Sequence, residues 1–416
     1  MHKHKLTIFG TLAAVAFQLA SAAAMAQVAS FEEIVKQTLA THPAILSKLS
    51  SSAAAKADRE GAAWQRFPTP SIETNNDNNG TRTSLLRVQQ PLWAGGRIDA
   101  GIDAANSRHR AAETAIRETK QETILRVIAA YVDAMRQQAR QETLAQGVHE
   151  HERLLGLITR RVEHEASPRV DQDLAQSRLY QASNDLSSVK QSLANALTQL
   201  SQLSGMQVRA VGGLESDGLS GPQSKELLLE QAIGWSPTLQ RLTFEAEAAE
   251  AEIELKRASY RPQVSLRYEN SRASAPLNGI PAYNTNRMLV VVEAQTGAGL
   301  SALSGVEAAI ARRDAAQQQR ETAVRELRER LTIDWDEFLA ARQRLENATL
   351  ASKSAKEVFE SYTRQYTAGR KTWLDVLNTI RESTQSDVAV TDARSQAAAA
   401  ALRLNLVSGN FKGISE

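Results

Sequence analysis

The stretch Tyr366-Thr367-Ala368-Gly369-Arg370-Lys371-Thr372-Trp373-Leu374-Asp375-Val376-Leu377-Asn378 separates two long helical patterns of polar and apolar residues. Gly369 can adopt the positive φ that closes the C-terminus of a helix. Thr372 can cap the following helix, and Asp375, three residues later, completes a capping box. The stretch therefore predicts a tight turn between two antiparallel helices.

A related turn occurs about 204 residues earlier, at His164-Glu165-Ala166-Ser167-Pro168-Arg169-Val170-Asp171-Gln172-Asp173-Leu174. Ser167 is a suitable helix cap there, and Pro168 suits the first helical position. Two long hairpins with related tips indicate that the chain is internally duplicated.

The segments on either side of the two tips follow one plan. Each half predicts a helix, a β-hairpin, a very long helix, a tight turn and a return helix. In the first half these are residues 31–64 with a break at His42-Pro43, 70–75 and 83–92, 97–164, and 168–203. In the second half the corresponding helix is 225–259, broken at Ser236-Pro237, and the strands are 262–269 and 287–295. A copy of the long helical hairpin follows, displaced along the chain by the longer loop between these two strands. A helix of about 68 residues spans about 100 Å, which is too long for an ordinary compact domain.

The composition and the N-terminus set further limits. Residues 1–26 have the basic start, apolar core and small-residue cleavage site of a secretory signal. Removing them leaves the first repeat at 27–213, a glycine-rich linker at 214–224 and the second repeat at 225–416. Lys3 and Lys5 leave with the signal, so the mature chain has 47 basic and 47 acidic residues and nothing favours nucleic acid.

The sequence carries no arrangement typical of an enzyme or a bound cofactor. It contains no cysteine, which excludes disulfides, thiolate metal sites and a cysteine nucleophile. No nucleophile elbow, phosphate loop or zinc spacing is present. His149 and His151 are two residues apart on a predicted helix, so they point to different faces and predict no metal site.

The predicted strands alternate in the way of a membrane barrel, with one face toward lipid and one toward a polar lumen. The candidate lipid face comprises Ser84, Leu86, Val88, Leu92, Val264, Leu266, Met288, Val290 and Val292. The candidate lumen comprises Arg87, Gln89, Arg267, Glu269, Arg287 and Glu293, with Leu85, Leu289 and Val291 as exceptions. Four strands cannot close a barrel, and open sheet edges are not tolerated in lipid, so several copies of the chain must combine.

These features resemble the TolC family of outer-membrane channels over nearly the whole mature chain. The resemblance rests on the duplication, on the tip from Tyr366 to Leu377, and on the junction Gln90-Pro91-Leu92-Trp93-Ala94-Gly95-Gly96. In the second repeat, Gly299 is the equivalent of Gly95. It implies an α+β fold in which a homotrimer forms one twelve-stranded outer-membrane β-barrel, continued by a long periplasmic α-helical barrel. It also implies a passive conduit, not an enzyme, that works with a periplasmic adaptor protein and an inner-membrane transporter.

The resemblance assigns roles to residues at the tip. It implies that the tip closes the tunnel and that Asp375 belongs to an acidic ring. The second ring position falls on Asn378, a departure that halves the ring charge. Lys371 stands where an arginine can bridge to a neighbouring helix, with Asp171 or Asp173 as partner. Tyr366 matches a tyrosine that hydrogen-bonds across the closed tip.

The second junction departs from the family pattern. Residues 295–299 lack the Pro-Leu-aromatic sequence found in the first half. With the sequence of the tip, this variant is most similar to the branch that serves type I secretion of large adhesins, in which the transporter is an ABC protein. The alternatives are a small-molecule efflux channel with an RND or MFS pump, and an exported structural coiled-coil protein.

Overall fold

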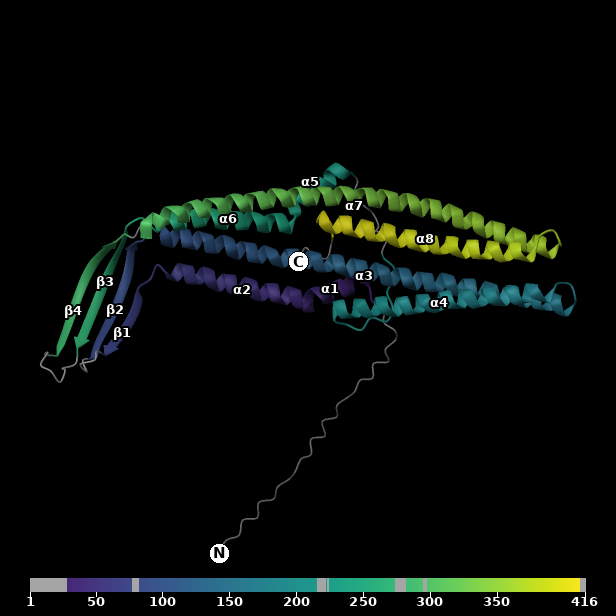
Figure 1. Cartoon of the computed structure of the whole chain (residues 1–416), viewed down its shortest axis with the longest axis horizontal. Coiled ribbons are helices and arrows are strands. Elements are labelled where there is room, and N and C mark those ends of the chain that lie inside the picture. Colours follow the sequence, from purple (N-terminus) through teal and green to yellow (C-terminus); the bar gives the residue numbers. More distant parts are fainter. Residues whose placement is uncertain are drawn as a thin grey trace, which may run out of the picture.

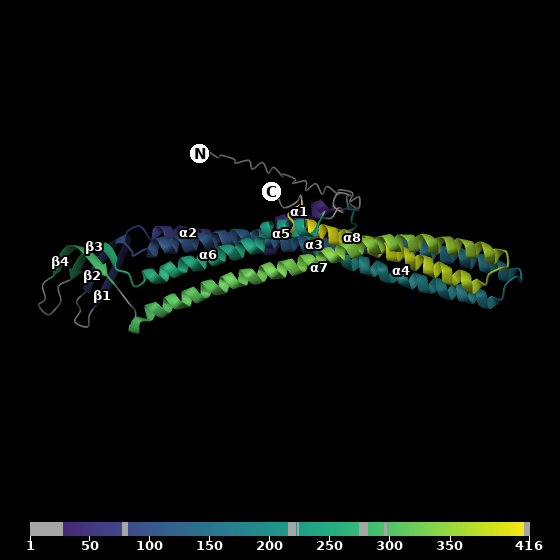
Figure 2. The ribbon, with the colours of Figure 1, turned by 90° about the horizontal axis from the view of Figure 1, so that it is seen from above.

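The computed structural model describes residues 28–76, 82–214, 222, 224–273, 282–294 and 298–411. The predicted signal, most of the predicted linker and residues 295–297 of the variant junction lie outside these ranges. The molecule is long and narrow, with a sheet at one end and two helical hairpin tips side by side at the other (Figures 1 and 2).

The order of elements confirms the duplicated plan. The first half contains α1 (Phe31–Thr41), α2 (Pro43–Trp64), β1 (Thr69–Asn76), β2 (Arg82–Trp93), α3 (Arg97–Glu163) and α4 (Arg169–Ser204). The second half contains α5 (Lys225–Trp235), α6 (Pro237–Ala258), β3 (Gln263–Ala273), β4 (Tyr283–Glu293), the 3₁₀ turn η2 (Ala298–Leu300), α7 (Ser301–Thr367) and α8 (Trp373–Val407). Helices α3 and α7 each have 67 residues, so each spans about 100 Å.

The two proline breaks lie where the sequence predicts them. His42 ends α1, and its Nδ1 accepts from the backbone N–H of Ala44 at 3.2 Å to cap α2. Ser236 does the same between α5 and α6, where its Oγ accepts from Leu239 N at 3.3 Å. Proline follows each cap at the first helical position, where its missing N–H costs no helical hydrogen bond.

The two long helices organise the helical part. Helix α3 contacts α2 and α6 toward the sheet and α4 and α8 toward the tips, while α7 contacts α6 and α8. The shorter helices therefore continue one another along α3 and α7 (Figure 1). None of the described helices is both long and apolar enough to cross a membrane.

The sheet is antiparallel in the order β1-β2-β3-β4, so the pairing of β2 with β3 joins the two halves. Strand β3 extends four residues past the predicted end at 269, and β4 begins four residues before 287. The added residues are mostly polar and show no apolar alternation. Their side chains continue the ladder instead: Asn270 Nδ2 donates to Asn284 Oδ1 at 2.8 Å.

Candidate functional site

The two hairpin tips have the same backbone geometry. In each tip the last turn of the incoming helix is closed by a pair of hydrogen bonds of the kind that ends helices at a left-handed residue. The pairs are Arg370 N to Gln365 O and Gly369 N to Tyr366 O, both 2.9 Å, and Ala166 N to Arg161 O at 2.7 Å and Glu165 N to Val162 O at 3.0 Å. Every atom of the first pair corresponds to one 204 residues earlier, which confirms the offset inferred from the sequence.

This correspondence aligns the aspartates of the tips. Gly369 has φ of 74° and Glu165 has φ of 56°, the only positive φ at a non-glycine residue in the described part of the chain. With Glu165 matched to Gly369, Asp171 occupies the position of Asp375, and Asp173 lies two residues further along α4. Asp171 lies in the first turn of α4, as Asp375 does in α8.

Asp375 closes the predicted capping box. Its Oδ2 accepts from the Thr372 backbone N–H at 3.1 Å and from the Thr372 hydroxyl at 2.8 Å, and its own N–H donates to Thr372 Oγ1 at 3.2 Å. These bonds, with the charge of Lys371, lower the pKa of Asp375 from its usual value. The carboxylate is thus held in a fixed place and in its charged form. Asn378 is exposed one turn later on the same helix.

Tyr366 connects the two hairpins within one chain. Its side chain is buried, and its hydroxyl lies 3.2 Å from Ser167 Oγ in the opposite tip. Arg161 donates to the same Oγ at 3.3 Å and lies 5.0 Å from the centroid of the Tyr366 ring. The sequence predicted Ser167 as the cap of α4 and Pro168 as its first helical residue, and this is wrong: Pro168 is the cap and Arg169 is the first helical residue. Proline has no side-chain acceptor, so the cap forms no side-chain bond, and the Ser167 hydroxyl instead contacts Tyr366 and Arg161.

Sequence reasoning missed Trp373, which is buried between the tips. The Trp373 ring lies 5.1 Å from that of Tyr366, and its Nε1 donates to the backbone oxygen of Asp171 at 2.9 Å. It belongs to the buried cluster Leu154, Ile158, Ala175, Phe359, Tyr366, Trp373, Val376, Leu377 and Ile380. An aromatic residue immediately after the Thr372 cap was the available signal.

Lys371 has a local partner. Its Nζ lies 4.2 Å above the Tyr362 ring, and among the described residues it forms no ion pair with Asp171 or Asp173. A bridge to either aspartate therefore requires a neighbouring copy of the chain and stays a prediction.

The strand register separates the sheet into two faces. Residues directly opposite in an antiparallel pair point to the same face, and the pairs Ile72–Leu86, Leu266–Val290 and Val264–Val292 form an apolar stripe. Val88 and Met288 also lie on it, opposite Tyr268. Leu92 adjoins the stripe at a bulge between Pro91 and Trp93. On the other face Arg87 Nε lies 3.2 Å from Glu269, and Arg267 donates to Gln89 at 3.1 Å.

The junction of sheet and helices depends on glycine. Gly95, Gly96 and Gly299 have φ of 63°, 90° and 58°. A Cβ at Gly95 would lie 2.8 Å from Arg261 Cβ, whereas one at Gly299 would meet nothing within 4 Å among the described residues. Arg261 also donates to the Gly95 carbonyl at 3.1 Å. The first junction is thus closely packed, and its repeat equivalent is open.

We expect Gly95→Ala to destabilise the folded chain more than Gly299→Ala. The positive φ costs about 1–2 kcal/mol at either site, and the clash with Arg261 adds to that only at Gly95. Gly61, inside α2 with nothing within 4 Å, is the matched control: Gly61→Ala should stabilise by up to about 1 kcal/mol. Thermal unfolding followed by helical circular dichroism measures all three, and equal losses at 95 and 299 would contradict the packing argument.

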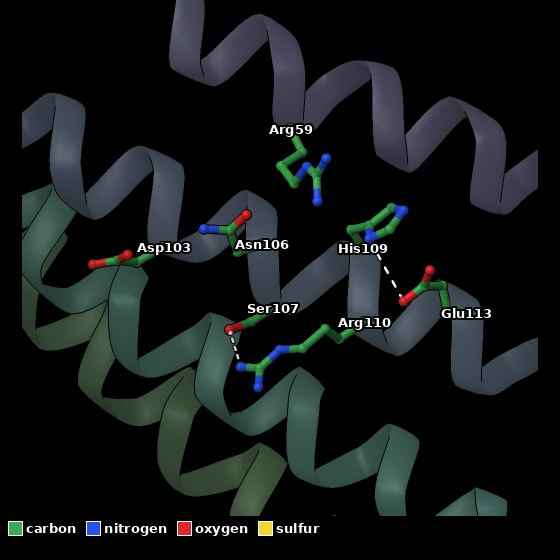
Figure 3. A pocket seen from close by; sticks show the side chains of 7 residues that line it. All are labelled: Arg59, Asp103, Asn106, Ser107, His109, Arg110 and Glu113. Atoms are coloured by element: carbon green, nitrogen blue, oxygen red, sulfur yellow. Dashed lines mark hydrogen bonds and ion pairs between the residues drawn. The ribbon is translucent and has the colours of Figure 1, made fainter.

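A polar hollow lies where α2 faces α3 (Figure 3). It is lined by Arg59, Asp103, Asn106, Ser107, His109, Arg110 and Glu113. His109 Nδ1 lies 3.7 Å from Glu113, and Arg110 pairs with Glu247 of α6. No group of three or more metal-binding side chains occurs in the described residues. The first of these pairs lies within α3, and the second joins α3 to α6.

Comparison with known proteins identifies the architecture. The family model described as outer membrane efflux protein matches residues 11–206 and 228–410. The chain belongs to this family. Its members are non-enzymatic channels of the outer membrane with a long periplasmic helical barrel. They are trimers that work with a periplasmic adaptor and an inner-membrane transporter. The chain is therefore an outer-membrane efflux channel of tripartite systems and not a structural coiled-coil protein.

Solved structures share the fold. The outer-membrane channel OprN has a TM-score of 0.80 at 16% identity, with 92% of this chain and 90% of that chain covered. VceC from Vibrio cholerae has a TM-score of 0.78 at 18% identity, covering 91% and 96%. A membrane protein from Pseudomonas aeruginosa has 0.78 at 18% identity, covering 91% and 90%. No curated protein sequence matches the chain.

Proposed function

We propose that the chain is the outer-membrane conduit of a type I protein secretion system, that its cargo is a large adhesin, and that its hairpin tips form the gate. The tip sequence Gly369-Arg370-Lys371-Thr372-Trp373-Leu374-Asp375-Val376-Leu377-Asn378 and the absence of Pro-Leu-aromatic from the second junction carry the choice of secretion. The transporter is then an ABC protein joined to the channel by an adaptor.

The sheet supports the channel part of this proposal. Strands β1 and β4 are the edges of the sheet, and their free backbone groups need partners in lipid. Three copies supply twelve strands, with β4 of one chain beside β1 of the next. The apolar stripe then faces lipid, and the Arg87–Glu269 and Arg267–Gln89 pairs face the lumen.

The tips support the position of the gate. The Tyr366–Ser167 contact and the Trp373–Asp171 bond hold the α7–α8 tip against the α3–α4 tip. Opening by movement of one hairpin past the other would break these few contacts and leave the long helices intact. In a trimer the three copies of Asp375 would approach one axis at this constriction, and Asp171 supplies the equivalent position of the first tip.

Efflux of small molecules is the second candidate, and it is compatible with the family description, outer membrane efflux protein. A channel shared between transporters is not itself selective for cargo, so the distinction lies in which substrates accumulate when the channel is removed.

Deletion of the gene should abolish surface display of a large adhesin while leaving sensitivity to hydrophobic drugs nearly unchanged. Immunoblotting of the cell surface and growth at graded drug concentrations measure the two phenotypes. Complementation by the unaltered chain controls for effects on neighbouring genes. Normal adhesin display combined with raised drug sensitivity would reverse the ranking in favour of efflux.

A further inference from the structure

Charge is distributed unequally between the two faces of the sheet. The described strands carry eight charged residues: Glu73, Arg82, Arg87, Arg267, Glu269, Arg272, Arg287 and Glu293. The strand register places six of them on the polar face, including all three carboxylates. Arg82 and Arg272 alone share the face of the apolar stripe. Among the described strand residues, that face therefore carries only positive charge.

Both arginines lie at the end of the sheet that is remote from the helices. Arg272 is directly opposite Ser84 on β2 and Asn284 on β4, and Arg82 is opposite Asn76 on β1. Arg82 is therefore a diagonal neighbour of Arg272, at a spacing of about 7–8 Å between backbones. Arg272 is exposed and forms no ion pair within the described part of the chain.

On β3 and β4 the residues change in a regular order from the apolar stripe toward Arg272, whereas on β1 and β2 the aliphatic pair Ile72–Leu86 extends to the level of Asn270. Val264, Val292, Leu266 and Val290 are followed by Tyr268, whose hydroxyl lies 3.4 Å from Asn286 Oδ1. Asn270 comes next, and its Nδ2 donates to Asn284 and to Asn286. Arg272 follows Asn270 on β3 at the level of Asn284, and Arg82 lies one step further from the helices. Aliphatic, then tyrosine, then amide, then cation is the order of groups met on crossing a bilayer from the hydrocarbon to the charged headgroups.

We infer that Arg82 and Arg272 bind the phosphate groups of lipid headgroups in the outer leaflet. The inference rests on the proposed insertion of the sheet in the outer membrane, which puts the end of the sheet that is remote from the helices on the outer side of that membrane. Guanidinium groups bind phosphate through two parallel hydrogen bonds and are always charged. The diagonal spacing allows both arginines to reach one headgroup that carries more than one phosphate, and a trimer would present three such sites.

Titration of the purified full-length channel in detergent with lipid A, a headgroup with two phosphates, tests the site. Native mass spectrometry measures the fraction of channel that carries lipid A. The double variant Arg82→Gln/Arg272→Gln should weaken binding by about tenfold or more, because each charged hydrogen bond to phosphate is lost. Arg267→Gln/Arg287→Gln removes the same charge from the opposite face and should leave binding unchanged.

A lipid A without phosphates, inorganic phosphate as a competitor, and a flotation assay separate the possible outcomes. Lipid A without phosphates should bind weakly, and inorganic phosphate should not displace lipid A. Equal binding by all variants, or displacement by inorganic phosphate, overturns the headgroup site. Every variant should float with phospholipid vesicles, which shows insertion. If the unaltered chain fails to float, the proposed channel fails as well, whereas flotation with equal lipid A binding overturns this inference alone.

Discussion

The double variant Tyr366→Phe/Lys371→Ala should raise the single-channel conductance of the resting channel in planar lipid bilayers. The Tyr366 hydroxyl lies 3.2 Å from Ser167, and a hydrogen bond of this kind contributes about 1 kcal/mol to the closed arrangement. If three tips open together, loss of the bond changes the open-to-closed balance by about 3 kcal/mol, or about a hundredfold. Lys371→Ala removes any bridge to a neighbouring chain.

Single variants separate the two contributions. Ser167→Ala removes the other partner of the hydroxyl and should raise conductance as Tyr366→Phe does, with no further gain when the two are combined. Tyr362→Phe keeps the ring beneath Lys371 and is the matched tyrosine control. If Lys371→Ala alone has no effect, its role is the local contact with Tyr362. If the double variant Tyr366→Phe/Lys371→Ala conducts like the unaltered channel, the gate lies elsewhere.

The sequence was informative wherever a local pattern decides the structure. The predicted start of α3 at 97 is correct and its end is within one residue, because apolar periodicity and the flanking glycine and turn are local signals. The strands were underpredicted at the hairpin end, where asparagine side chains support pairing without apolar alternation. The division of the sheet into faces followed from period-two alternation alone.

The contacts between the tips were harder to predict from the sequence. The Thr372–Asp375 capping box joins residues three positions apart and was predicted in full. The Ser167–Tyr366 and Asp171–Trp373 contacts join residues about 200 positions apart, which local propensity does not encode. Duplication indicated that the tips are related, but the aspartate register needed the backbone, because Glu165 holds the left-handed position that Gly369 fills in the other tip.

Asp375→Asn should weaken the block of the resting channel by divalent cations and leave trimer assembly intact. In the proposed trimer the ring carries three formal charges from Asp375, and cation affinity in a narrow passage rises with that number. The amide oxygen of asparagine can still accept from the Thr372 backbone N–H, and the N-cap Thr372 is unchanged, so the helix start should survive. The current through one channel as a function of cation concentration measures the block.

The reciprocal variant Asn378→Asp restores a second acid one turn along α8 and should strengthen the block, which makes it the matched control.

Acidification gives a third test of the role of Asp375. Hydrogen bonds from Thr372 lower the pKa of Asp375, so the carboxylate and its capping bonds persist above the unfolded pKa and are lost as pH falls through the folded value. Crowding of three carboxylates opposes this shift. The block should therefore disappear on acidification in the unaltered channel and be independent of pH in Asp375→Asn. An unchanged block in Asp375→Asn, with no gain in Asn378→Asp, would leave Asp375 as a helix cap only.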